Sequence, residues 1–163
     1  MARIPITLNL HMSEIIYDTQ NETYLTGRAR ANGQNHEQVA NMQANDDEEN
    51  LNQVLRNIGA AFATLKTELS EYIVGTDTSA SDTLITPSAS LTLTLSMPSN
   101  YDKATVETLV SAAHQYIVCT AVSNWFLITN KADAADYVSK AASYLEQIRK
   151  AANRRVRPER PTI

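Results

Sequence analysis

The chain has 163 residues, of which 43% are apolar and 20% are charged, as expected for one globular domain. It contains no run of about 18 apolar residues, so we expect no membrane-spanning helix, and its first residues lack the apolar segment of a secretory signal. The single cysteine, Cys119, excludes an internal disulfide and fits a reducing compartment. Residues 1–145 carry 8 Lys and Arg against 16 Asp and Glu, whereas residues 146–163 carry 6 against 2. This acidic body argues against a broad phosphate-binding surface, which needs dense basic residues.

Two segments, residues 4–11 and 91–97, alternate apolar and polar residues. A period of two predicts β-strands with one apolar and one polar face. The predicted sheet-core positions lie on the apolar faces of these strands: Leu8, Leu10, Leu93 and Leu95. Because two strands are only marginally stable in water, they need a covering helix or strands from a second subunit. The pattern leaves open whether they pair within one chain or between chains.

The segment after the first strand predicts a short helix that begins near Ser13, a candidate N-cap, and ends at Gly27. Residues 27–37 contain an Asn-Gly turn signal and are expected to form an exposed loop. Residues 39–45 are rich in Asn and Gln and favour neither helix nor strand.

The clearest helix is predicted over residues 46–74. Its apolar residues recur at steps of three and four and form one stripe: Leu51, Leu55, Ile58, Phe62, Leu65, Leu69 and Tyr72. Four carboxylates at residues 46–49 favour the positive end of the helix dipole, and Gly75 is expected to end the helix. The stripe fits either a core helix or a coiled-coil seam with a second copy. Residues 75–90 are expected to form a polar connector, extended over residues 83–86.

Two further helices are predicted over residues 101–129 and 131–153. Ser99 or Asn100 is expected to cap the first of them. Its residues 125–128 are all apolar, so this end is expected to be buried on several sides. The short connection between the two helices favours an antiparallel hairpin.

Two prolines in residues 154–163 exclude a continued helix, so this basic segment is predicted to be an extended C-terminal tail. Residues 1–153 are predicted to form a single domain. Its fold class is α+β and mainly helical, with the three main helices over residues 46–74, 101–129 and 131–153 and a small sheet of the two strands described above.

The sequence contains no motif for catalysis, cofactor binding or metal binding. Its glycines are isolated from one another, and His114 and Cys119 do not share a helix face. The carboxylates at residues 46–49 do not converge on one cation. Arg28 and Arg30 are interpreted as solvated residues of the predicted loop rather than as phosphate contacts. We therefore expect a protein that is not an enzyme and has no cofactor and no metal ion.

The basic tail is the one functional lead. Its candidate partner-docking residues are Arg154, Arg155, Arg157 and Arg160. They fit an acidic patch on a partner or on a neighbouring copy, or nucleic acid. A disordered end that only aids solubility is the alternative interpretation.

Three stretches resemble small structural proteins of crAss-like tailed bacteriophages: Tyr24-Leu25-Thr26-Gly27-Arg28, Asn45-Asp46-Asp47-Glu48-Glu49-Asn50-Leu51 and Trp125-Phe126-Leu127-Ile128-Thr129-Asn130. The order of strands and helices and the basic end extend this resemblance over nearly the full length. It implies a neck or tail component of the virion, assembled in the host cytoplasm and similar to head-to-tail connectors.

The resemblance also implies the partners: copies of the chain in a homo-oligomeric ring, the portal and other neck or tail proteins, and DNA that passes through the channel without sequence-specific binding. It implies no membrane partner, and it carries over no catalytic residues. The two predicted strands depart from the simplest all-helical connector.

Three other functions stay open. A nucleic-acid-binding accessory protein would use the basic tail, and its affinity for DNA would depend on salt. A small enzyme with a site between subunits would need ionisable groups clustered in a cleft. An adaptor domain would bind one host protein.

Overall fold

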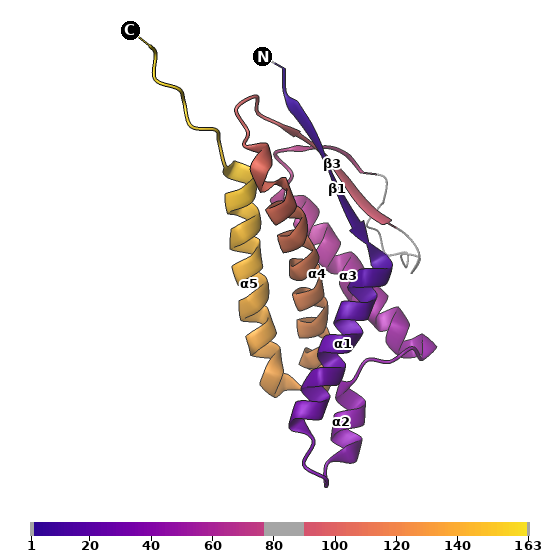
Figure 1. Ribbon diagram of the computed structural model, residues 1–163. Coiled ribbons are helices and arrows are strands. Elements are labelled where there is room, and N and C mark those ends of the chain that lie inside the picture. The colour runs from indigo at the N-terminus through magenta and orange to yellow at the C-terminus, as the bar shows by residue number, and fades with distance from the viewer. Residues whose placement is uncertain (1, 77–89, 163) are drawn as a thin grey trace.

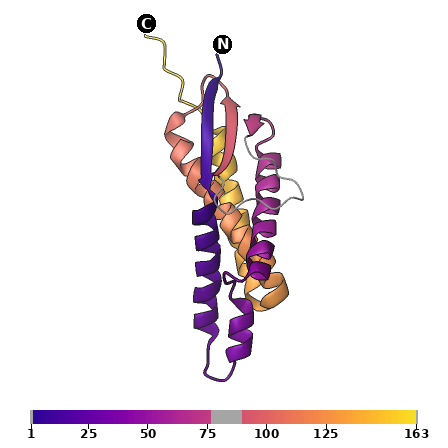
Figure 2. The same ribbon diagram turned by 90° about the vertical axis from the view of Figure 1, so that its right-hand side faces the viewer.

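In the computed structural model, which describes residues 2–76 and 90–162, long helices run side by side and a small sheet packs against one half of their length (Figures 1 and 2). The described elements are, in chain order, β1 (Ile4–His11), α1 (Met12–Arg30), α2 (His36–Met42), α3 (Glu48–Glu68), β2 (Ile73–Thr76), β3 (Ser90–Met97), a 3-10 turn (Lys103–Thr105), α4 (Val106–Thr129) and α5 (Lys131–Asn153). The architecture is α+β and mainly helical, as predicted.

The sheet has the strand order β1-β3-β2, and both pairs of neighbours are antiparallel. β1 and β3 pair from Ile4 opposite Met97 to His11 opposite Ser90, so the two predicted strands pair within one chain. The buried face of β1 and β3 consists of Ile6, Leu8, Leu10, Leu91, Leu93, Leu95 and Met97. This burial confirms the predicted sheet-core positions, because alternate side chains of a strand point to one face.

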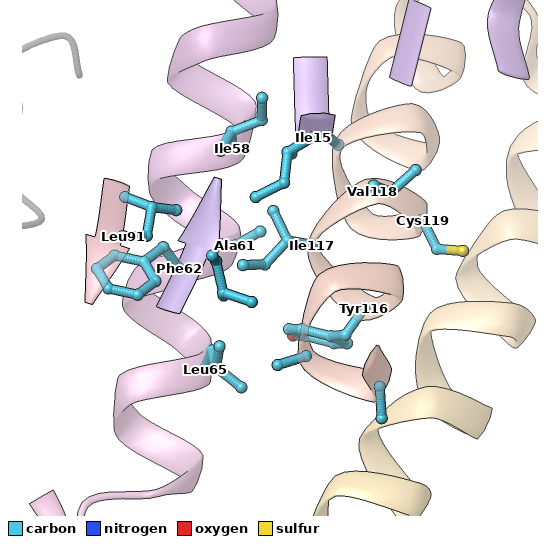
Figure 3. Close-up of a cluster of buried hydrophobic side chains, with 14 of the residues drawn as sticks. Ile15, Ile58, Ala61, Phe62, Leu65, Leu91, Tyr116, Ile117, Val118 and Cys119 are labelled. Atoms are coloured by element: carbon cyan, nitrogen blue, oxygen red, sulfur yellow. The ribbon is translucent and has the colours of Figure 1, made fainter. Parts of the chain in front are cut away.

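The central helix is α4, which contacts β1, α1, α2, α3 and α5. Figure 3 shows that Phe62 and Leu65 of α3 lie on the side of Ile117, whereas Cys119 lies on the opposite side of α4, toward α5. A helix that is buried on several sides must be apolar around most of its circumference. This explains why α4 has no polar stripe along its middle turns.

The two ends of α4 differ from the prediction. The helical segment begins with the 3-10 turn, which Asp102 caps by accepting a hydrogen bond from the Ala104 N–H at 3.0 Å, instead of Ser99 or Asn100. At the other end, Trp125 and Phe126 are buried, but Leu127 and Ile128 are 52% and 72% exposed. The expectation that residues 125–128 are buried on several sides was therefore wrong for two of the four.

The prediction of one helix over residues 46–74 was also wrong, because α3 ends at Glu68. Leu69 and Tyr72 continue the apolar stripe and are buried, but they lie in a turn. Ile73 then pairs with Leu95 of β3, and Gly75 lies in β2 at a register shift instead of ending a helix. Residues 69–72 are therefore apolar where they are buried, as in a helix, but the pairing of the next residues with β3 replaces the helical backbone by a turn and a strand.

The prediction of three main helices does not match the structure, whose described residues form five α-helices. α1 is longer than expected, since it passes Gly27 and ends at Arg30. A Cβ atom on Gly27 would lie 2.6 Å from Nε2 of Gln43, so glycine allows this close approach inside the helix. α2 occupies part of the predicted loop over residues 27–37 and of the ambiguous segment. The prediction of an extended segment over residues 83–86 lies outside the described residues.

The hairpin of α4 and α5 is confirmed. α5 covers the predicted residues 131–153, and the two helices pack side by side in opposite directions (Figure 1). Buried alanines such as Ala134, Ala141 and Ala152 allow the close approach of α5 to α4. The hairpin returns the chain to the end of the molecule at which β1 begins (Figure 1).

We predict that Leu93→Ala lowers the free energy of unfolding by about 3 kcal/mol, because it removes a fully buried side chain from the sheet core. The matched control, Thr94→Ala, changes the polar face of the same strand and should cost less than about 1 kcal/mol. Chemical denaturation measures both values. Equal costs for the two variants would contradict the assigned burial of β3.

Candidate partner-binding surfaces

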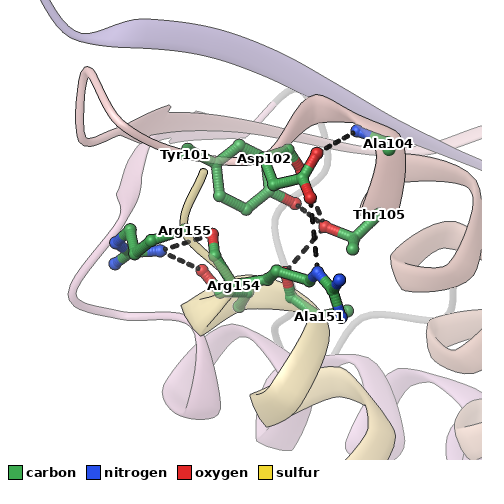
Figure 4. A network of polar contacts seen from close by, with 8 residues as sticks. Tyr101, Asp102, Ala104, Thr105, Ala151, Arg154 and Arg155 are labelled. Atoms are coloured by element: carbon green, nitrogen blue, oxygen red, sulfur yellow. Dashed lines mark hydrogen bonds and ion pairs between the residues drawn. The ribbon is translucent and has the colours of Figure 1, made fainter. Parts of the chain in front are cut away.

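The C-terminal tail is attached to the domain by its first residues (Figure 4). The Asp102 N–H donates a hydrogen bond to the carbonyl oxygen of Arg154 at 3.2 Å, and the Val156 N–H donates to that of Asn100 at 2.8 Å. Between them, Arg155 forms an antiparallel bridge with Tyr101, whose side chain is buried. The start of the tail therefore has a fixed position and direction.

Two of the four predicted docking arginines use their side chains within this attachment. Nε of Arg154 lies 3.3 Å from Oδ2 of Asp102, in an exposed ion pair that contributes little stability. Arg155 donates to the carbonyl oxygens of Ala152 and Arg154 at 3.1 Å and to the Tyr72 hydroxyl at 3.3 Å. Arg154 and Arg155 thus help to hold the tail on its own domain.

The other two, Arg157 and Arg160, are exposed, and neither has an ion pair or a side-chain hydrogen bond within the described residues. Beyond Val156 the tail extends away from the domain (Figures 1 and 2). Pro158 and Pro161 favour the polyproline II conformation, which has three residues per turn and a rise of about 3.1 Å per residue. In that conformation Arg157 and Arg160 project from the same side, about 9 Å apart.

A second surface is a groove of about 470 Å³ where β1 ends, α1 begins and α4 starts. The residues that line it, called the junction groove below, are Asn9, Leu10, His11, Glu14, Asp18, Val106, Glu107, Val110, Ser111 and His114. Leu10 is buried and Val106 and Val110 are partly buried, so they give the groove an apolar part. Sequence reasoning missed this groove, because it joins residues about 100 positions apart.

The junction groove carries three carboxylates. Glu14 and Glu107 are exposed and have no ion pair or side-chain hydrogen bond within the described residues. The carboxylate of Asp18 contacts the ring of His114, with 2.6 Å between Oδ2 of Asp18 and Nε2 of His114. The N-termini of α1 and α4 each add roughly half a positive charge. The three carboxylates outweigh these two partial charges, so the groove is negative when His11 and His114 are neutral.

The backbone of β1 has an open edge that leads into this groove. The Ser96 N–H donates to the carbonyl oxygen of Tyr72 at 2.7 Å, so it faces β2 and not its β1 neighbour Pro5. Backbone groups alternate sides along an antiparallel strand. Those of Pro5, Thr7 and Asn9 therefore point away from β3. Pro5 has no N–H and blunts one end of this edge, whereas the outward amides of Thr7 and Asn9 pair with no strand among the described residues.

The remaining candidate residues have structural partners. Arg28 and Arg30 belong to the last turn of α1 and not to the predicted loop. Arg28 lies over the ring of Tyr24, 5.8 Å from its centroid, and Arg30 forms an ion pair with Asp133. Cys119 is buried, and desolvation raises the pKa of its thiol to about 11. Asp46 accepts a hydrogen bond from Gln20 at 2.9 Å. No group of three or more His, Cys, Asp or Glu among the described residues is placed to hold a metal ion.

Polar contacts join the last turn of α1 to the first turn of α5. Nε of Arg30 donates to Oδ2 of Asp133 at 3.0 Å, and Asn130 donates to the same carboxylate. The hydrogen bond from Arg30 lowers the pKa of Asp133 below its ordinary value of 3.8. Nearby, the Tyr137 hydroxyl donates to Glu22 at 2.8 Å, and burial raises the pKa of Tyr137 to about 12.

The comparisons with known proteins give no match: no family model, no curated protein and no solved structure is significantly similar to this chain. Within the described residues, no helix combines the length and the apolar character that crossing a lipid bilayer requires. The surfaces described above are therefore interpreted from their own chemistry.

We predict that Asp133→Asn lowers the free energy of unfolding at pH 7 by about 1–2 kcal/mol, because a hydrogen-bonded charge is lost. Since the pKa of Asp133 is lowered in the folded state, its carboxylate stabilises the fold above about pH 3.8 and loses this effect as the pH falls through the lowered pKa. Urea denaturation should therefore show a gap between variant and parent that is smaller at pH 3 than at pH 7. The control Asp136→Asn removes an exposed neighbouring carboxylate and should show no comparable gap. A gap that persists unchanged at pH 3 would contradict this role of Asp133.

Proposed function

We propose that this chain is a structural subunit of a homo-oligomeric ring in the neck or tail of a tailed bacteriophage. The observation that carries the proposal is that one chain has two exposed surfaces of opposite character. The tail presents Arg157 and Arg160, and the junction groove presents carboxylates beside an open strand edge. Surfaces of this kind serve contacts between polypeptides, and no group of three or more His, Cys, Asp or Glu among the described residues is placed to hold a metal ion.

The acidic body agrees with a position around a DNA channel. Residues 1–145 have an excess of eight acidic over basic residues. A negative wall repels the phosphate backbone, so DNA can slide along it without binding to a sequence. In this proposal the portal and other neck or tail proteins are the neighbours of the ring, the virion is its location, and the protein is not an enzyme.

An alternative function is that of an accessory protein that binds nucleic acid through its tail. The exposure of Arg157 and Arg160 favours it, because guanidinium groups pair readily with phosphate. Only these two of the four tail arginines lack partners within the described residues, which limits the number of phosphate contacts.

We predict that native mass spectrometry of the full-length chain finds a closed oligomer with one dominant number of copies, alone or with a portal protein. An open series of sizes would indicate a filament instead of a ring. A chain that stays monomeric at all concentrations and binds no portal or tail ring would contradict the proposed function.

The alternative function gives a separate expectation, measured with duplex DNA at 50 and 200 mM salt. An accessory protein would bind DNA with an affinity that falls steeply with salt, and removal of residues 154–163 would abolish it. A ring subunit should show weak binding, with little effect of the deletion.

A further inference from the structure

We propose that the junction groove binds the C-terminal tail of a second copy of this chain. Arg157 and Arg160 of the tail lie against the carboxylates of Glu14, Asp18 and Glu107 in this arrangement. The inference rests on the proposed oligomeric function. It goes further by identifying the two surfaces that contact each other between neighbouring copies.

Charge complementarity selects this occupant. The groove is an acidic surface with an apolar part beside an edge of β1, and the tail is the most basic segment of the sequence. Glu14 and Asp18 lie one helical turn apart on α1, and Glu107 lies across the groove on α4. Two arginines about 9 Å apart on one side of a polyproline II segment can reach carboxylates on both walls.

The apolar residues of the two surfaces also match. In polyproline II, Pro158 and Pro161 share a side that differs from the arginine side. Val106 and Val110 offer partly buried apolar surface to such prolines. Pro158 and Pro161 restrict the backbone of the tail, so it loses less conformational freedom on entering the groove than a segment without prolines would lose.

The direction of the tail favours the groove of a second copy over the groove of the same chain. The Val156 N–H is hydrogen-bonded to Asn100, beyond the end of β3 that pairs with Ile4, whereas the β1 residues of the groove begin at Asn9. Asn9 lies five positions further along β1 than Ile4, about 17 Å. From Val156 the tail leaves the domain in a direction away from the groove (Figure 1).

Each chain then gives one tail and receives another. Such a contact joins two different surfaces, and its repetition produces a ring if the rotation between neighbours closes. This geometry is compatible with the proposed function, and it makes the contact testable at single positions.

The first test is disulfide cross-linking between full-length chains that carry Cys119→Ser. One chain carries Ser111→Cys in the groove and a second, differently tagged chain carries Thr162→Cys at an exposed position of the tail. Under mild oxidation we expect a covalent dimer that contains both tags. The control replaces Ser111→Cys by Ser143→Cys, an exposed position on α5 outside the groove, and should give little dimer.

The second test reverses charges and then restores the complementarity. Glu14→Lys with Glu107→Lys, or Arg157→Glu with Arg160→Glu, should each lower the cross-linking yield about fivefold, since exposed ion pairs are individually weak. Combining both reversals should recover the yield. A control with Glu37→Lys and Glu71→Lys makes the same change of net charge at exposed positions outside the groove and should leave the yield unchanged.

The outcomes separate this inference from the proposed function. Oligomers that form without a groove-to-tail cross-link, or that ignore the charge reversals, would overturn the inference and leave the proposed ring intact. A full-length chain that never associates would overturn both. A cross-link that forms only within one chain carrying both Ser111→Cys and Thr162→Cys would also overturn the inference, because it would place the tail in its own groove.

Discussion

The fold depends on one constraint, which is that α4 must be covered on several sides. Its middle turns are apolar around most of the helix, and Ala113, Ile117, Ala121 and Val122 have no exposed surface. α3, α5, α1 and the sheet each cover one sector of it. Even the polar group of Trp125 is satisfied from outside α4, since its Nε1–H donates to the carbonyl oxygen of Met42 at 2.8 Å. Helices and strands far apart in the sequence are brought together by this shared neighbour.

The same constraint creates the two surfaces discussed above. Because α5 must run back along α4, the chain end returns to the sheet and the tail leaves from there (Figure 1). Because β1 and α1 cover different sectors of α4, a groove remains at the point where one passes into the other. Two of the three carboxylates at this point, Glu14 and Glu107, lie in the first turns of α1 and α4, where carboxylates favour the helix dipole. A local preference of each helix thus gives the groove its charge.

The sequence was sufficient for the parts of the fold that local periodicity determines. The alternation of residues 4–11 and 91–97 predicted both strands, and the spacing in residues 131–153 predicted α5 with its bounds. Where tertiary contacts compete with a local signal, the prediction was wrong. Leu69 and Tyr72 continue a helical stripe but are buried in a turn before β2. Gly27 predicted a helix end, yet it lies within α1, where the absence of a side chain lets Gln43 pack closely against it. For the candidate site, the sequence indicated the basic tail but could not separate Arg154 and Arg155 from Arg157 and Arg160, since this division depends on contacts with residues 72 and 102.

Hydrogen–deuterium exchange of the full-length chain, at concentrations below and above its association, tests the central claim most directly. The account predicts that the amides in the middle of α4 exchange most slowly at both concentrations. It also predicts that protection increases on association at the groove end of β1, in the first turns of α1 and α4, and in residues 156–162. Protection that does not change in these segments, or that increases only elsewhere, would contradict an assembly built from the tail and the junction groove.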